Sequence, residues 1–187
     1  GGLTDWKGRV GWAPNNASFQ AMVSAMRVAW GDAPTREWLS GMLANEPKSY
    51  ANNTAIVAAT ATGEIDVGLV NHYYLYRCIQ EDGETFTARN YHLKEGGPAN
   101  LVMVAGAGIL ETSKNKDNAE RFLKFMLSAV AQQYFAGQTY EYPLVEGVTT
   151  HRLLVPLDQV GRPDIGMAAL EDVVGTQALL RGLGVIP

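Results

Sequence analysis

The chain has 187 residues, 47% of them hydrophobic, which is ordinary for a packed globular domain or a large piece of two domains. Its formal net charge of -4 argues against nucleic-acid binding, because nucleic-acid-binding surfaces are usually basic. No apolar run approaches the roughly 18 residues of a membrane-spanning helix, and the single cysteine, Cys78, excludes an internal disulfide.

The chain begins with a predicted strand over residues 9–13. Asn15 or Asn16 can cap the helix that follows, since the side-chain oxygen of asparagine accepts a hydrogen bond from a free helical N–H group. That helix has an apolar stripe at helical spacing, formed by Phe19, Met22, Val23, Met26 and Trp30. Residues 31–33 interrupt the pattern, and Pro34 suits the first turn of a second amphipathic helix.

A short extended piece at residues 48–51 leads to a third helix over residues 55–62. Asn53 or Thr54 is the expected N-cap of this helix. The run at residues 65–70 is mostly apolar, and it predicts a buried strand.

Two adjacent tyrosines, Tyr73 and Tyr74, follow this strand. In an extended strand neighbouring side chains point to opposite faces, so two phenols could not share one target there. Residues 75–80 favour a helix, and at the start of a helix adjacent side chains diverge by only about 100°, so that both oxygens can converge. Such junctions, at the carboxyl ends of strands, are where α/β proteins bind ligands. A half-buried aromatic patch is the alternative explanation of the pair.

Two further strands are predicted at residues 87–93 and 101–110. The second contains the start of a dinucleotide-binding fingerprint at Gly106 and Gly108, but Glu111 stands where the last glycine belongs. The fingerprint is therefore incomplete, and close backbone packing explains these glycines better.

The remaining pattern is helical, with segments at residues 115–127 and 128–135 and a C-terminal helix over residues 167–183 that breaks at Gly175. The residues expected to face inward from the first of these helices are Ala119, Phe122, Leu123 and Met126. Strands alternate with helices along the chain, and this alternation predicts an α/β fold.

Several stretches of the chain resemble the extracytoplasmic ferric-ion-binding proteins of ABC iron importers. The central one is a strand that ends in Asn-x-Tyr-Tyr, which here reads Asn71-His72-Tyr73-Tyr74. Other stretches match in order and at compatible spacing, at residues 6–14, 16–20, 50–53, 63–69 and 141–144. The resemblance covers nearly the whole chain.

The resemblance implies the type 2 periplasmic-binding-protein fold, whose backbone crosses twice between two lobes. This chain would form mainly the second, C-terminal lobe, from residues 1–102 and 152–187. Residues 103–151 would belong to the first lobe, which is incomplete here. The chain starts Gly1-Gly2-Leu3, so we expect its signal peptide to lie outside these residues.

The resemblance also implies a cargo, ferric iron, bound by the phenolate oxygens of Tyr73 and Tyr74. Ferric ion is a small, hard cation, and hard cations prefer oxygen ligands. In the family, a histidine or carboxylate from the first lobe completes the shell, and those ligands are not in this chain. His72 stands beside the pair, and we expect it to support the helix, because the tyrosines need the directions that face the site.

A phosphate, carbonate or carboxylate anion is implied as a further iron ligand. Asn16, Ala17 and Ser18 begin a helix, and the free N–H groups and partial positive charge of a helix N-terminus bind anions. Asn53 and Asn71 correspond to family positions that add amide donors. Plain helix capping is the alternative role of Asn16 and Asn53, and the two roles are compatible. Some relatives carry a tyrosine at the position of Ala17 and need no anion, so Ala17 favours the anion-dependent type.

We therefore predict a solute-binding protein, not an enzyme, that captures ferric iron and delivers it to the membrane component of an ABC permease. The expected location is extracytoplasmic, in the periplasm or lipid-anchored at the surface of a Gram-positive cell. A binding protein for a small anion or a sugar phosphate is one alternative. An enzyme on the same fold is another, although the sequence contains no Gly-x-Ser-x-Gly, His-Glu-x-x-His or Walker motif.

The segment at residues 101–145 contains apolar residues that would contact the first lobe. A large apolar surface is rarely left uncovered in a soluble protein. Exchange of elements between copies is a low-cost route to a dimer, so we expect two copies of this chain to pair through this segment as a homodimer.

Overall fold

The structure is a computed structural model, and it describes residues 6–83, 85–93 and 96–187. Residues 1–5, at the start of the predicted C-terminal lobe, lie outside the described residues. Within the described ranges, no helix combines the length and the apolar character needed to cross a bilayer.

The chain divides into two compact units. Unit 1 comprises Gly1–Leu101 and Val160–Pro187, and unit 2 comprises Val102–Gln159. The first boundary between the units, after Leu101, lies next to the predicted boundary after residue 102. The chain returns to unit 1 at Val160, later than the predicted return at residue 152. The assignment of the units to the lobes of a longer protein stays a prediction.

Unit 1 contains a small parallel sheet with β1 in the centre. From edge to edge the strands are β2 (Lys48–Ser49), β1 (Val10–Trp12) and β3 (Val67–Gly68). Gly11 pairs with Lys48 on one side and with Gly68 on the other. Glycine suits both central positions, because an added Cβ would lie 2.4 Å from Ile65 Cδ1 at position 11 and 2.2 Å from Ile56 Cγ2 at position 68.

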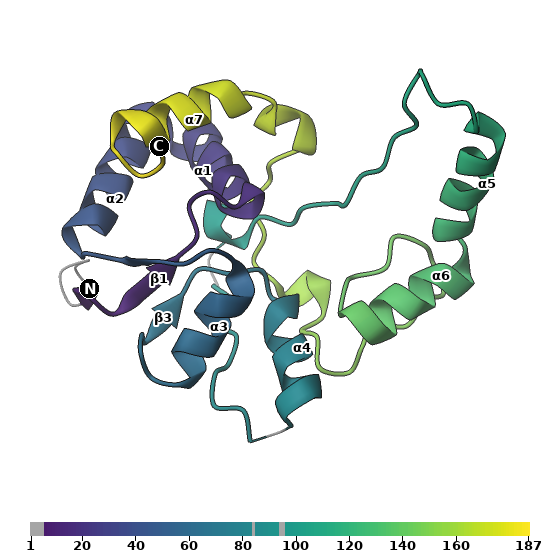
Figure 1. Cartoon of the computed structure of the whole chain (residues 1–187), viewed down its shortest axis with the longest axis horizontal. Coiled ribbons are helices and arrows are strands. Elements are labelled where there is room, and N and C mark those ends of the chain that lie inside the picture. Colours follow the sequence, from purple (N-terminus) through teal and green to yellow (C-terminus); the bar gives the residue numbers. More distant parts are fainter. Residues whose placement is uncertain (1–5, 84, 94–95) are drawn as a thin grey trace. The chain divides into compact units, whose positions relative to one another are not determined.

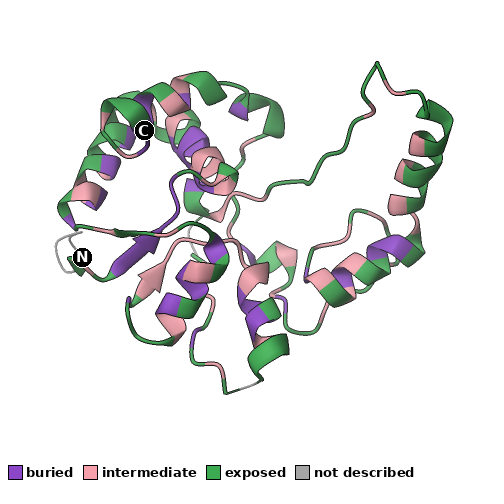
Figure 2. Ribbon diagram, in the orientation of Figure 1, coloured by how far each residue is buried: buried purple, intermediate pink, exposed green. Residues whose placement is uncertain are grey.

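Helices pack on both faces of this sheet (Figure 1). Unit 1 contains α1 (Ala17–Trp30), α2 (Asp32–Ala44), α3 (Asn53–Ala61), α4 (Tyr73–Asp82) and α7 (Val173–Gly182), with short 3-10 turns at Pro98–Asn100 and Met167–Leu170. One apolar cluster joins α1, α2 and α7 to β1, and α3 contributes to two others, the second of them shared with α4. Figure 2 shows buried residues on the sides of these helices that face the sheet and one another.

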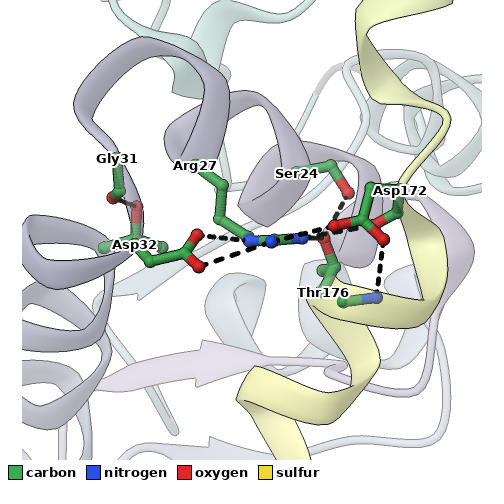
Figure 3. Close-up of polar contacts among 8 residues, drawn as sticks. Ser24, Arg27, Gly31, Asp32, Asp172 and Thr176 are labelled. Atoms are coloured by element: carbon green, nitrogen blue, oxygen red, sulfur yellow. Dashed lines mark hydrogen bonds and ion pairs between the residues drawn. The ribbon is translucent and has the colours of Figure 1, made fainter.

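Arg27, an arginine of α1, links α1, α2 and α7 (Figure 3). Its Nε lies 2.7 Å from Asp32 Oδ1 at the start of α2, and its Nη2 lies 3.0 Å from Asp172 Oδ2, beside α7. Its Nη1 donates to Thr176 Oγ1 at 3.0 Å, and that hydroxyl lies 2.7 Å from Ser24 Oγ. The network therefore joins the last helix of the chain to the first two.

Capping residues determine where the helices begin. Asn16 caps α1 as predicted, since its side chain accepts a backbone N–H bond of 3.1 Å. The predicted cap of α3 is wrong, because Asn52 takes this role instead of Asn53 or Thr54. Asn52 has an extended backbone (φ -161°, ψ 172°) and accepts from Ala55 N at 2.9 Å, whereas Asn53 is already the first helical residue.

The break in the C-terminal helix comes before Gly175, not at it. The 3-10 turn ends at Leu170, and α7 begins at Val173. Asp172 is the N-cap, and its carboxylate accepts from Gly175 N at 2.9 Å. The acidic cap therefore places Gly175 inside the first turn of α7.

The buried strand predicted at residues 65–70 is only partly correct. Val67–Gly68 pairs with β1, and Ile65 is buried. Leu69 N still donates to Gly11 O of β1 at 3.0 Å, but β3 ends at Gly68. Residues 69–72 become an irregular connection to α4.

The strands predicted at residues 87–93 and 101–110 are wrong, since both segments are irregular. Side chains hold the first segment instead, because Thr87 Oγ1 donates to the last carbonyl of α3 and Asn90 Nδ2 donates to His72 O. Residues that favour strands form one only where a neighbouring strand can pair with them. The sequence pattern does not reveal whether such a neighbouring strand is present.

Unit 2 is mainly helical. It contains α5 (Lys116–Met126), α6 (Ala129–Tyr134), a π-helical turn at Phe135–Thr139 and a 3-10 turn at Leu157–Gln159. Ser128 caps α6, because its hydroxyl accepts from Ala131 N at 3.3 Å.

Unit 2 exposes much of its apolar surface. None of the residues of α5, all of which are described, is buried. The prediction that Phe122 faces inward is wrong, since it is 59% exposed, and the other predicted inward residues of α5 are only half-buried. The exposed large apolar residues of this unit include Met103, Val104, Leu110, Phe122, Phe125, Leu127, Val130, Tyr134, Leu144 and Leu153.

Candidate functional site

The three strands in the described part of unit 1 lead into helices at the same edge of the sheet, which we call the carboxyl edge. β1 is followed by α1, β2 by α3 and β3 by α4, and the strands are parallel. Three helix N-termini therefore lie at this edge, each with free N–H groups and a partial positive charge. In the described residues, the first turns of these helices contain no acidic side chain that would offset the charge.

The two tyrosines open α4 at the carboxyl edge. Tyr73 and Tyr74 are its first two residues, so the predicted helix start is confirmed, whereas β3 ends earlier than predicted, at Gly68. Their ring centroids lie 4.5 Å apart with an interplanar angle of 32°, and both side chains are half-buried. Two phenols thus lie side by side at an edge where three helix dipoles favour negative charge.

His72 packs against aromatic rings next to the pair. Its ring is edge-on to Tyr73, with centroids 5.5 Å apart, and lies 6.4 Å from the ring of Tyr76. Tyr76 is buried one turn further along α4. This arrangement agrees with a supporting role for His72.

The amide side chains predicted at the anion site occupy two places on the carboxyl edge. Asn53 is 2% exposed, and its Nδ2 donates to Asn71 Oδ1 at 2.9 Å, so the structure brings these two residues together. Asn16 Oδ1 accepts from both the N and the Oγ of Ser18, at 3.1 and 3.2 Å, and Ala17 is the exposed first residue of α1. The side-chain oxygen of Asn16 therefore caps its helix.

Asn90 is a residue at this edge that the sequence analysis missed. Its Nδ2 donates to His72 O at 2.8 Å, directly before the tyrosine pair. The strand predicted at residues 87–93 offered no reason to connect Asn90 with α4. Only the three-dimensional contact reveals it.

Carboxylate, histidine and cysteine side chains do not gather in this part of the molecule. Among residues 6–83, 85–93 and 96–187, no group of three or more of them is arranged to hold a metal ion. The oxygen donors at the carboxyl edge are phenols and amides.

The match to a protein family covers most of the chain. Residues 2–154 fit the family model described as bacterial extracellular solute-binding protein. The chain belongs to this family. Solute-binding proteins bind and carry their ligands, so the prediction of a binding protein rather than an enzyme is confirmed.

Individual relatives of this solute-binding protein are named for iron. The chain is 32% identical over 180 residues to the major ferric iron-binding protein of Neisseria meningitidis serogroup B (strain ATCC BAA-335 / MC58). The aligned region covers 96% of this chain and 54% of that protein. It is 31% identical over 168 residues to the Fe(3+)-binding periplasmic protein of Serratia marcescens, covering 89% of this chain and 49% of that protein. The chain thus spans about half the length of these curated relatives.

A solved structure gives the same result for the fold. The crystal structure of iron-bound HitA from Pseudomonas aeruginosa superposes with a TM-score of 0.91 at 31% sequence identity, covering 98% of this chain and 61% of that chain. The predicted type 2 periplasmic-binding-protein fold and the resemblance to ferric-ion-binding proteins of ABC iron transport are therefore confirmed.

Proposed function

We propose that this chain supplies one half of a ferric-ion site, in which Tyr73 and Tyr74 bind the cargo through phenolate oxygens. The observation that carries the proposal is the pair of phenol rings, 4.5 Å apart, at the start of α4 on the carboxyl edge. Ferric ion prefers such hard oxygen ligands. The relatives named for ferric iron support the same cargo.

Protons compete with iron for these oxygens. An unperturbed phenol has a pKa of about 10, so at neutral pH iron must displace a proton from each tyrosine. Binding therefore releases protons, and acid weakens it.

A phosphate, carbonate or carboxylate anion completes the proposed site on this chain. The N-terminus of α1 at Asn16, Ala17 and Ser18 supplies N–H groups, and the positive ends of α1, α3 and α4 favour a negative ligand. Asn71 and Asn53 add amide groups beside the tyrosines. The anion both binds the helix ends and offers iron another oxygen.

The protein that contains this chain works outside the cytoplasm and delivers iron to an ABC permease, in line with its family of extracellular solute-binding proteins. The other iron ligands come from the part of the longer relatives that this chain does not span. A ferric chelate that leaves positions open can stand in for that part in an experiment.

The test is a titration of the 187-residue chain with ferric nitrilotriacetate. Nitrilotriacetate is tetradentate and leaves two neighbouring positions of an octahedral ion for the tyrosines. We expect a visible phenolate-to-iron absorption band, and we expect Tyr73→Phe or Tyr74→Phe to remove most of it, because each change deletes one oxygen and almost no volume. Tyr134→Phe, at an exposed tyrosine of α6, is the matched control and should leave the band unchanged.

A colourless mixture, or a band that both single variants retain, would show the tyrosine assignment to be wrong. The alternative cargoes, a small anion or a sugar phosphate, predict no colour with iron. They predict binding of the anion alone at the same edge of the sheet.

A further inference from the structure

We infer that Asn90 is a positioning residue for the tyrosine pair, acting through the carbonyl of His72. This inference rests on the proposed ferric site and adds a residue that orients the tyrosine ligands of that site. The tyrosines follow an irregular connection, residues 69–72, that lies between β3 and α4.

Hydrogen bonds to three other segments help to hold this connection. Leu69 N donates to β1 at 3.0 Å, Asn71 Oδ1 accepts from Asn53 at 2.9 Å, and His72 O accepts from Asn90 at 2.8 Å. The Asn90 contact is the nearest of the three to the tyrosines. Its loss would remove the hydrogen bond that joins this connection to the segment containing Asn90.

The bond to His72 O acts directly on Tyr73, because one peptide plane contains both. The carbonyl of His72 and the N and Cα of Tyr73 lie in the same rigid plane, so a donor that fixes the oxygen also fixes the origin of the Tyr73 side chain. His72 is the N-cap of α4 but makes no side-chain cap bond of its own. Asn90 therefore supplies from another segment a side-chain contact at the helix start.

Asn90 is able to do this because its own segment is anchored. Ala88, two residues earlier, is buried in an apolar cluster with Leu75 and Cys78 of α4. Thr87 binds the last carbonyl of α3. The segment is irregular, yet it is attached to both helices, and Asn90 is half-buried at the end nearer the tyrosines.

The test compares two single variants of the 187-residue chain in the ferric nitrilotriacetate titration. Asn90→Leu keeps a similar volume and removes the donor, and leucine is preferred to aspartate because a carboxylate could bind iron itself. Thr87→Val removes the other anchor of the same segment. We expect Asn90→Leu to shift the absorption band and to speed removal of iron by excess chelator about tenfold, the size of effect that one net hydrogen bond produces. Thr87→Val should leave the spectrum unchanged.

The outcomes separate positioning from simple stability. If Asn90→Leu matches the wild-type spectrum and release rate while Tyr73→Phe loses the band, the inference fails and the proposed function stands. If Asn90→Leu and Thr87→Val change the spectrum equally, Asn90 acts only by holding the segment, which also overturns the inference. If the tyrosine variants keep the band, the proposed function fails, and this inference fails with it.

A second variant covers the case in which Asn90→Leu does not fold. Asn90→Ser is polar but too short to reach the His72 carbonyl, so it should release iron faster, as the leucine variant does. Retention of the wild-type release rate by a folded Asn90→Ser variant would contradict the inference.

Discussion

At the scale of single residues, the amide side chains at the carboxyl edge differ in how far they are already hydrogen-bonded to other residues. Asn53 is buried and gives an N–H to Asn71 Oδ1, so Asn71 is the more accessible amide of the two. The side-chain oxygen of Asn16 already accepts hydrogen bonds from Ser18. The anion proposal therefore depends chiefly on backbone N–H groups at α1 and on Asn71.

Replacing Asn71 with leucine should weaken iron binding mainly when the anion is scarce. The change removes an amide beside the tyrosines and retains both phenol groups. Because it also removes the bond from Asn53, the response to added anion, and not the affinity alone, tests the anion site. We expect the absorption band of Asn71→Leu with ferric iron to recover as phosphate or carbonate is added in excess. Asn118→Leu, at an exposed position of α5, controls for the loss of an amide alone. An iron affinity that does not respond to added anion, in the unchanged chain, would contradict an anion-dependent site.

The sequence predicted the position of the tyrosine pair at the start of a helix because this signal is local. A strand pattern that gives way to a helix pattern at Tyr73 is contained within about a dozen residues, and the family motif lies on the same stretch. Asn90 could not be predicted in this way, because its partner His72 lies 18 residues away and the contact depends on how the segment packs on α3 and α4. The cap of α3 was misplaced for a different reason. Asn52 and Asn53 are chemically identical, and only the backbone angles distinguish the cap from the first helical residue.

At the scale of elements, the sheet is shorter and the connections are longer than the sequence predicted. The segments at residues 87–93 and 101–110 have strand-like composition, but no described strand pairs with them. The helices were predicted more accurately, since their periodicity and caps are properties of the segment itself. The start of α7 is an exception, since the predicted break was at Gly175, whereas Asp172 caps the helix and also pairs with Arg27.

The contact of α7 with α1 should depend on pH. The pKa of Asp172 is lowered, first by the hydrogen bond from Gly175 N and then by Arg27, and the pKa of Asp32 is lowered chiefly by its hydrogen bond with Arg27. A carboxyl group whose pKa is lower in the folded state than in the unfolded state stabilises the fold at pH values above its unfolded-state pKa. That contribution is lost as the pH falls through the lowered folded-state pKa.

We therefore expect Asp172→Asn to lower the melting temperature at neutral pH and to have little effect in acid. Asparagine can still cap α7, so the change mainly removes the ion pair with Arg27. Thermal unfolding by circular dichroism across the acid range checks this, with Asp158→Asn at an exposed position of unit 2 as the control. A difference between Asp172→Asn and wild type that persists undiminished at low pH would contradict an electrostatic origin.

At the scale of the whole molecule, the two units differ in how completely they bury their apolar residues. Unit 1 encloses its clusters, whereas unit 2 leaves the side chains of α5 and α6 exposed. For the 187-residue chain by itself, we propose that two copies pair through residues 101–145. The exposed aromatic residues Phe122 and Phe125 lie within this segment.

Light scattering at micromolar concentration should give the mass of a dimer. The double change Phe122→Asp and Phe125→Asp places charges on the exposed face of α5 and should shift the mass toward the monomer, while the iron-dependent absorption of unit 1 remains. A monomeric mass for the unchanged chain would rule out this pairing.

The contacts of α7 with β1 and α1 also have a consequence for the order in which the chain folds during synthesis. The cluster around β1 includes Leu179, Leu180 and Ile186, and Thr176 reaches back 152 residues to Ser24. A nascent chain emerges from its N-terminus, so β1 and α1 are synthesised long before the residues of α7 that pack against them. Closing so long a loop has a large entropic cost and slows folding. The core around β1 can therefore close only after the residues of α7 have been synthesised.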